Sequence, residues 1–156
     1  MTDENLLMKL KIERIVLKDL SFEAPLGQSV FIGEWQPDID LSLNLHSDRL
    51  GQNVWEVVIT ATVTAKVQAG VAYVIEVQEA GVFNVPSLKG EYLKRALQIE
   101  APGLIFPYLR EAVDAVSARG GFPPVNMLPF DFQAQFEEAN QSPSSPEDET
   151  TPPATD

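Results

Sequence analysis

Four oxygen-bearing side chains at every second position are the first residues whose spacing suggests chemistry. Asp38, Asp40, Ser42 and Asn44 follow the spacing of the first half of a calcium-binding loop. Such a loop needs a glycine at its sixth position and a bidentate acid at its end, where this chain has a leucine and an arginine. Apolar residues occupy the intervening positions, so the pattern favours the solvent-facing side of a β-strand. We expect no metal site here.

Other reactive residue types are scarce. The chain has no cysteine, which excludes disulfides, thiolate metal sites and a cysteine nucleophile. Its single histidine, His46, follows a predicted strand, a position more typical of a solvated loop residue than of a catalytic base. Motifs for phosphate binding, dinucleotide binding and a serine nucleophile are absent. We therefore expect no enzyme and no cofactor, with an acid-dependent hydrolase that uses two convergent carboxylates as an alternative.

Composition narrows the class of protein further. The 156 residues, 44% of them hydrophobic, suffice for one domain with a core. The chain has 23 acidic and 11 basic residues, a formal net charge of -12, which argues against nucleic-acid binding. Its acidic start and the lack of a long apolar run argue against a secretory signal and membrane insertion. We expect a soluble, cytoplasmic protein.

Both ends of the chain differ from its middle. From residue 141 the sequence reads QSPSSPEDETTPPATD, which is rich in proline and acids and has no large apolar side chain. Such a segment cannot bury enough apolar surface to offset the entropy of ordering. We therefore expect a flexible N-terminus at 1–8, one domain at 9–140, and a disordered tail at 141–156.

The first half of the domain alternates as β-strands do. Apolar and polar residues alternate over 9–23, 38–45, 54–67 and 71–78, with many β-branched residues. A phase change at 15–17 predicts a bulge, and 68–70 predicts a turn. Together these segments predict a four-stranded antiparallel sheet.

The second half has helical spacing. A helix over 91–99 should end before Pro102, and a second should carry Pro107 in its first turn and end at Gly120 and Gly121. Asp131 can cap a short last helix. Strands followed by helices give an α+β fold with helices on one side of the sheet. A fold with few helices cannot easily cover all its aromatic and apolar side chains, so we expect packing between subunits or an open apolar groove.

Five stretches in series resemble the SecB family of bacterial protein-export chaperones. They are KDLSFEAP at 18–25, FIGEWQP at 31–37, EVQEAGVF at 76–83, LIFPYLRE at 104–111 and RGGFPP at 119–124. The resemblance runs from about residue 9 to residue 136. It implies a homotetramer, a dimer of dimers with an eight-stranded sheet across each dimer and helices packed between the dimers. It also implies an ATP-independent holdase that binds unfolded preproteins and delivers them to the SecA motor.

Two other roles stay open at this point. Some SecB-like chaperones serve toxin–antitoxin systems. A binding module for a small apolar ligand would instead require a closed pocket rather than a groove. Suppression of client aggregation without ATP distinguishes a holdase from the ligand-binding module and from the hydrolase.

The resemblance also assigns residues to three surfaces. Regular pleating places Asp19 and Glu23 on one face of the first strand, and the family's SecA-binding positions match Asp19, Glu23, Val74 and Glu76. The client-binding groove is expected at Trp35, Ile39, Leu41, Leu43, Phe83, Leu128, Phe132 and Phe136. The subunit interface is expected at Ile75, Val77 and Glu79.

Overall fold

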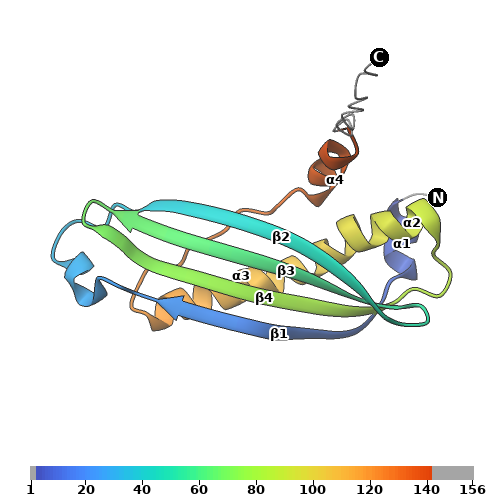
Figure 1. Cartoon of the computed structure of the whole chain (residues 1–156), viewed down its shortest axis with the longest axis horizontal. Coiled ribbons are helices and arrows are strands. Elements are labelled where there is room, and N and C mark those ends of the chain that lie inside the picture. The colour runs from blue at the N-terminus through green and yellow to red at the C-terminus, as the bar shows by residue number, and fades with distance from the viewer. Residues whose placement is uncertain (1–2, 142–156) are drawn as a thin grey trace, which may run out of the picture.

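The computed structural model describes residues 3–141 of the chain (Figure 1). Its elements, in chain order, are α1 (Asp3–Lys9), β1 (Lys11–Glu23), the 3-10 helix η1 (Gly27–Phe31), β2 (Asp38–Gly51), β3 (Val54–Val67), β4 (Gly70–Asn84), α2 (Gly90–Arg95), the π-helical segment η2 (Ala96–Glu100), α3 (Ala101–Arg119) and α4 (Phe132–Gln141). The fold is α+β, as the sequence predicts.

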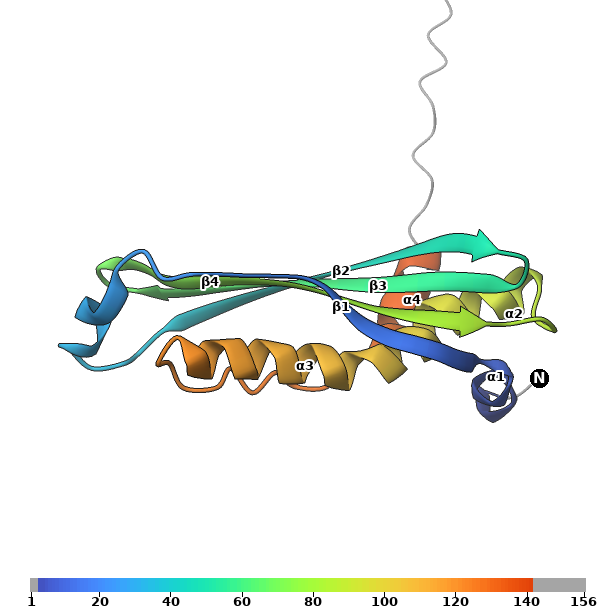
Figure 2. The ribbon, with the colours of Figure 1, turned by 90° about the horizontal axis from the view of Figure 1, so that it is seen from below.

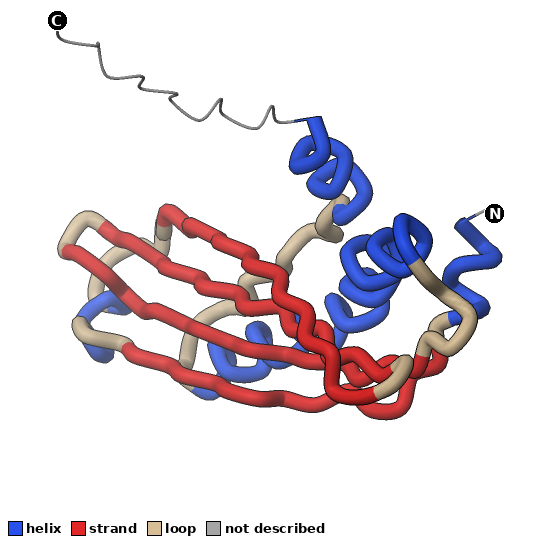
Figure 3. The backbone as a smooth tube through the Cα atoms, turned by 45° about the vertical axis from the view of Figure 1, so that its right-hand side comes forward, coloured by secondary structure: helices blue, strands red, loops and turns tan. Residues whose placement is uncertain are grey.

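The four strands form one antiparallel sheet in the order β1-β4-β3-β2. Tight turns join β2 to β3 and β3 to β4. Strand β1 comes first in the chain but pairs with β4, the last of the four strands. The long helix α3 lies along one side of the sheet (Figures 2 and 3). We call that side the inner face and the opposite side the outer face.

Strand β3 shows why the sheet has two distinct faces. Its bounds, Val54–Val67, match the predicted strand. Five apolar side chains point to the inner face and are fully buried: Val57, Ile59, Ala61, Val63 and Ala65. Threonines at the alternate positions point to the outer face, where β-branched side chains suit a pleated surface.

The N-terminal part of the chain differs from our expectations in two respects. Residues 3–9 form the helix α1 and Leu6 is buried, whereas we expected a flexible segment at 1–8. An apolar anchor on the core offsets the cost of ordering this helix. In β1 the register shifts lie between Ile12 and Arg14 and between Leu17 and Asp19, on either side of the predicted bulge.

The helical half is more continuous than the prolines suggest. Helix α2 runs through η2 into α3, although we expected Pro102 to end one helix and Pro107 to begin the next. Proline has no N–H to donate to a preceding carbonyl. The wider π-helical turn before Pro102 changes the hydrogen-bond pattern there, so the helix continues without that donor. Pro107 lies inside α3 and leaves the carbonyl of Gly103 without its usual partner.

The predicted end of α3 and the predicted start of α4 are confirmed. Helix α3 stops at Gly120, and Gly121 has a positive φ of 84° that suits glycine. Asp131 accepts a hydrogen bond from the N–H of Ala134 at 2.9 Å and so caps α4. The tail that we expected at 141–156 lies outside the described residues, apart from Gln141 at the end of α4.

Helix α3 packs mainly on the two central strands, β4 and β3. The inner faces of the edge strands therefore keep apolar side chains exposed. On β1 these are Ile12, Leu17 and Leu20, and on β2 they are Ile39 and Leu41. The fold thus leaves two apolar strips open, one on either side of α3.

The close packing of α3 on β4 gives a test at Gly81. A Cβ atom at this position would lie 2.6 Å from the ring of Phe83 and 3.1 Å from Ile105. Phe83 is fully buried and cannot move aside, so we expect Gly81→Ala to lower the free energy of unfolding by about 1–3 kcal/mol. Urea denaturation measures the change. Gly33→Ala is the control, because its Cβ would meet open space, and equal effects of the two changes would contradict this packing.

Candidate functional site

The inner face of β2 carries a row of partly exposed apolar side chains. Ile39 is 39% exposed and Leu41 is 40% exposed. Leu43 and Leu45 continue the row but are half-buried against the core. All four alternate with polar residues that point to the outer face, so the strand presents a continuous apolar strip to solvent.

An aromatic cluster lies at the end of the sheet where α3 finishes. The ring of Phe122 is at its centre, 4.8 Å from Tyr73, 5.1 Å from Phe31 and 5.3 Å from Trp35, measured between centroids. Phe22 completes the cluster at 6.2 Å from Phe122. Of these five residues we assigned only Trp35 to the groove. Phe31 and Phe122 belong to the stretches FIGEWQP and RGGFPP, which were the available signal for them.

The crossover segment, residues 122–131, connects α3 to α4 without regular structure and runs back along α3 (Figures 1 and 2). Met127 is buried, whereas Leu128, one of the predicted groove residues, is 82% exposed. A cavity of about 540 Å³ lies between α3 and this segment, with Phe106, Phe130 and Phe132 among its lining residues. The crossover therefore adds apolar surface beside α3.

Three predicted groove residues are buried within the protomer rather than open to solvent. Phe83 lies on the inner face of β4 beside Gly81. The ring centroids of Phe132 and Phe106 are 6.1 Å apart. Lys94 Nζ lies 5.7 Å from the ring centroid of Phe136. The two phenylalanines of α4 lie four residues apart, on one face of the helix, and pack on the rest of the protomer. This packing anchors α4, because a helix this short is not stable without it.

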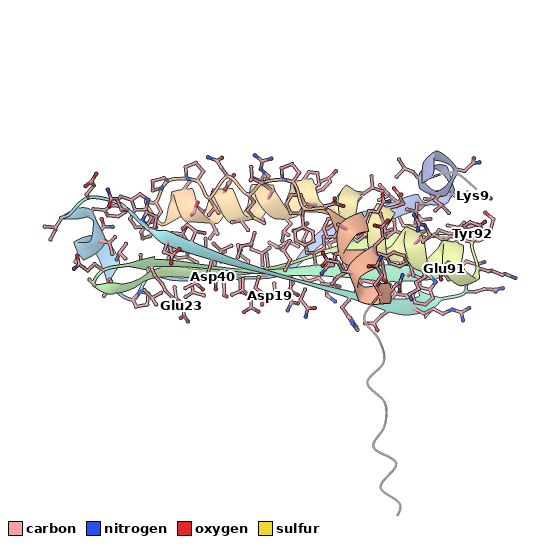
Figure 4. All side chains as sticks on the ribbon, turned by 90° about the horizontal axis from the view of Figure 1, so that it is seen from above. Lys9, Asp19, Glu23, Asp40, Glu91 and Tyr92 are labelled. Atoms are coloured by element: carbon pink, nitrogen blue, oxygen red, sulfur yellow. The ribbon has the colours of Figure 1, made fainter. Side chains whose placement is uncertain are left out.

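The four residues predicted to bind SecA meet on the outer face of the sheet. Glu23 pairs with Val74, and Glu76 lies next along β4 on the same face, as does Asp19 on β1. Figure 4 shows Asp19 and Glu23 on the side of the sheet opposite α3. Asp40 of β2 lies in the same cross-strand row as Val74, a neighbour that the sequence did not reveal. We call these five residues the acidic patch.

Most of the charge in the acidic patch is not neutralised within the protomer. Within residues 3–141, Asp19, Glu23 and Glu76 form no ion pair with a basic side chain. By contrast, Lys18 and Glu56 pair at 2.8 Å elsewhere on the sheet. Carboxylates of this kind can interact with a basic partner.

The predicted interface residues lie beneath α3. Ile75 and Val77 are fully buried and Glu79 is 5% exposed, all on the inner face of β4. Val77 pairs with Leu20 and Glu79 with Leu17, the residues of β1 whose side chains remain exposed. These three residues therefore support the open strip of β1 rather than forming a free surface themselves.

Glu79 is an ionisable group in an apolar setting. Its neighbours across the strands are Leu17 on β1 and Ile59 on β3. Burial, and then the nearby charge of Glu111 on α3, raise the pKa of the Glu79 carboxyl above its ordinary value. The charged form is thus disfavoured in the folded protein.

The residues with possible metal-binding spacing behave as a strand. Asp38, Asp40, Ser42 and Asn44 alternate along the outer face of β2, which confirms that interpretation. No group of three metal-ligating side chains occurs within residues 3–141. His46 lies within β2, not in a loop, and its Nε2 lies 2.9 Å from Oδ2 of Asp48.

Among residues 3–141, none of the helices has the length and the apolar character that a membrane span requires.

Comparison with known proteins identifies the family. The family model described as preprotein translocase subunit SecB matches residues 3–143. The chain belongs to the SecB family. SecB proteins are chaperones rather than a class of enzymes, so membership agrees with the open apolar surfaces described above.

Curated relatives cover most of the chain. The protein-export protein SecB of Hahella chejuensis is 43% identical over 82% of this chain and 80% of its own length. That of a Marinomonas species is 40% identical over 85% of this chain and 84% of its own length. A SecB-like chaperone of Mycobacterium tuberculosis, solved with a ChAD peptide from an antitoxin, superposes with a TM-score of 0.66 at 18% identity, covering 82% of this chain and 95% of its own. The last comparison shows a shared fold.

The raised pKa of Glu79 predicts a pH-dependent stability. Because the folded protein binds this proton more tightly than the unfolded chain, the stability that Glu79 provides is present below the ordinary glutamate pKa of about 4.3 and is lost as pH rises through the raised value. We expect Glu79→Gln to be more stable than the parent at pH 7, with the difference shrinking toward pH 4. Chemical denaturation across this range measures it. Glu91→Gln, at an exposed site on α2, is the control, and a pH-independent difference for Glu79→Gln would contradict the prediction.

Proposed function

We propose that this member of the SecB family is an ATP-independent holdase of the cytoplasm that binds unfolded preproteins and delivers them to SecA. The observation that carries the proposal is the apolar strip of β2, open to solvent beside the aromatic cluster. Unfolded chains present apolar side chains in no fixed order, so their capture requires apolar area more than precise polar contacts. The curated relatives at 40–43% identity, named protein-export proteins, favour export over a toxin–antitoxin role.

The client groove in this proposal combines three parts of the protomer. They are the inner face of β2 at Ile39, Leu41 and Leu43, the aromatic cluster with Trp35, and the exposed Leu128 of the crossover. Three predicted groove residues support the groove without lining it, because they are buried and hold β4 and α4 in place: Phe83, Phe132 and Phe136. The open shape argues against a closed pocket for one small ligand.

The proposed homotetramer accounts for the second open strip. Strand β1 is an edge of the sheet, and Ile12, Leu17 and Leu20 are each 40–50% exposed on its inner face. Pairing of the β1 edges of two protomers would extend the sheet to eight strands and bring the β1 strips of the two protomers side by side, while the β2 strip stays open. Ile75, Val77 and Glu79 would then act on the interface through β1 and α3, against which they pack.

The acidic patch is the proposed docking surface for SecA. Asp19, Glu23 and Glu76 offer carboxylates, and Val74 adds an apolar contact between them. Asp19 and Glu23 of the patch lie on the outer face (Figure 4). The proposed client groove lies on the inner face. A client and the motor can therefore bind at the same time.

The client groove is tested by the double change Leu41→Ser and Leu43→Ser. We expect client affinity to fall about tenfold or more, since full burial of one such side chain contributes about 1.5–3 kcal/mol. Calorimetry with an unfolded client and suppression of its aggregation without ATP measure the effect, while light scattering checks that the tetramer persists. The matched control is Ser42→Ala with Asn44→Ala, on the outer face of the same strand. Unchanged binding by the double leucine variant would remove these residues from the groove.

The docking surface is tested by Glu76→Lys. We expect SecA binding to weaken about threefold or more at low salt, and the difference to shrink as salt screens the charges. Client binding should remain near that of the parent, because the groove is on the other face. Asp48→Lys makes the same charge change at a distant site on the outer face, and an equal loss with that control would show a general charge effect instead of a local patch.

A further inference from the structure

The crossover segment bends sharply around one side chain of α3. The N–H groups of Val125 and Asn126 both donate to Oδ1 of Asp114, at 3.0 Å and 3.1 Å. Asn126 has a φ of 54°, in the left-handed region that residues with side chains rarely adopt. Hydrogen bonds to a carboxylate are stronger than those between neutral groups, so Asp114 can hold this bend.

Ser117 links the backbone of α3 near Asp114 to the start of the crossover. The hydroxyl of Ser117 donates to the carbonyl oxygen of Asp114 at 3.0 Å, and Ser117 is fully buried. The carbonyl oxygen of Ser117 accepts the N–H of Phe122 at 3.0 Å. The crossover is therefore tied to α3 at two points, its start at Ser117 and its middle at Asp114.

Phe122 and Leu128, which lie close to these ties, belong to the proposed client groove. Phe122 lies next to the first tie and forms the centre of the aromatic cluster. After the second tie, Met127 points into the core and Leu128 points to solvent. Burial, and then the charge of Asp114, raise the pKa of the Tyr73 hydroxyl in the aromatic cluster.

We infer that Asp114 is a positioning residue of the client groove: by accepting both N–H groups at the bend, it keeps Phe122 within the aromatic cluster and Leu128 on the exposed side. Asp114 does not need to touch the client. The inference rests on the proposed function, since the groove binds clients only if the protein is a holdase. The ligand chemistry is an unfolded polypeptide segment with apolar and aromatic side chains.

Client binding by Asp114 variants tests this inference. The probe is a reduced, carboxymethylated and permanently unfolded polypeptide, added without ATP to the full-length assembled protein. We expect Asp114→Ala to weaken binding about tenfold, as expected for loss of two bonds to a charged acceptor. Asp114→Asn keeps an acceptor oxygen and should bind with intermediate affinity. Glu111→Ala is the control, because Glu111 lies on the same helix and lines the same cavity without bonding to the crossover.

Amide hydrogen exchange separates positioning from general destabilisation. In Asp114→Ala the amides of Val125 and Asn126 should exchange faster, whereas those of β3 and β4 should stay protected. Parent-like client binding by Asp114→Ala and Asp114→Asn overturns the inference. If Asp114→Ala does not fold, Asp114→Asn alone decides, with unchanged affinity as the contradicting result. Failure of the parent to bind the probe would instead contradict the proposed function.

Discussion

One helix covers a sheet that is wider than itself, and most other features of this protein follow from that mismatch. Neighbouring strands lie about 4.8 Å apart and a helix with its side chains is about 10 Å across, so α3 can shield about two strands of four. It lies on β4 and β3, most of whose inner residues are buried. The edge strands keep the same apolar alternation without a cover. An isolated protomer therefore exposes apolar surface on both sides of the long helix α3.

The two uncovered strips differ in what surrounds them. The strip of β1 lies at an edge whose backbone groups are unpaired, which favours association with an identical edge. The strip of β2 is bordered by the aromatic cluster and by the crossover, which make an irregular apolar surface. An irregular surface suits varied polypeptides, while a regular strand edge suits a copy of itself. One cause thus accounts for both the proposed assembly and the proposed groove.

Much of the fold was predictable because it depends on local patterns. Alternation defined β3 to the residue, and Asp131 and Gly120 marked helix ends through capping geometry that operates within a few residues. Pro102 misled the helix prediction, because the adjoining π-helical turn depends on how the whole segment packs. Single-residue proline rules do not include that packing.

The candidate site was harder to predict because its parts are far apart in the sequence. Pleating and the family resemblance placed Asp19, Glu23 and Glu76 on one surface, and the strand register confirms that they lie together. The burial of Phe83 and Phe136 could not be read from their types, since a phenylalanine in a groove and one in a core look the same in a sequence. The roles of Tyr73 and Asp114 likewise depend on a crossover whose path has no periodic signal.

The pairing of the first strand with the last has a consequence for how the chain reaches this structure. Strands β2, β3 and β4 are joined by tight turns and can assemble from neighbouring residues, whereas Lys11 must find Asn84. Closing that long loop is the costliest step in entropy, so β1 is expected to join the sheet last. During synthesis β1 is made before the other three strands and remains unpaired until β4 has been made. Strand β1 carries four charged side chains in its first eight residues, Lys11, Glu13, Arg14 and Lys18. Charges of this kind discourage aggregation of an unpaired strand. A protein built to hold unfolded chains thus passes through a stage in which its own first strand needs such protection.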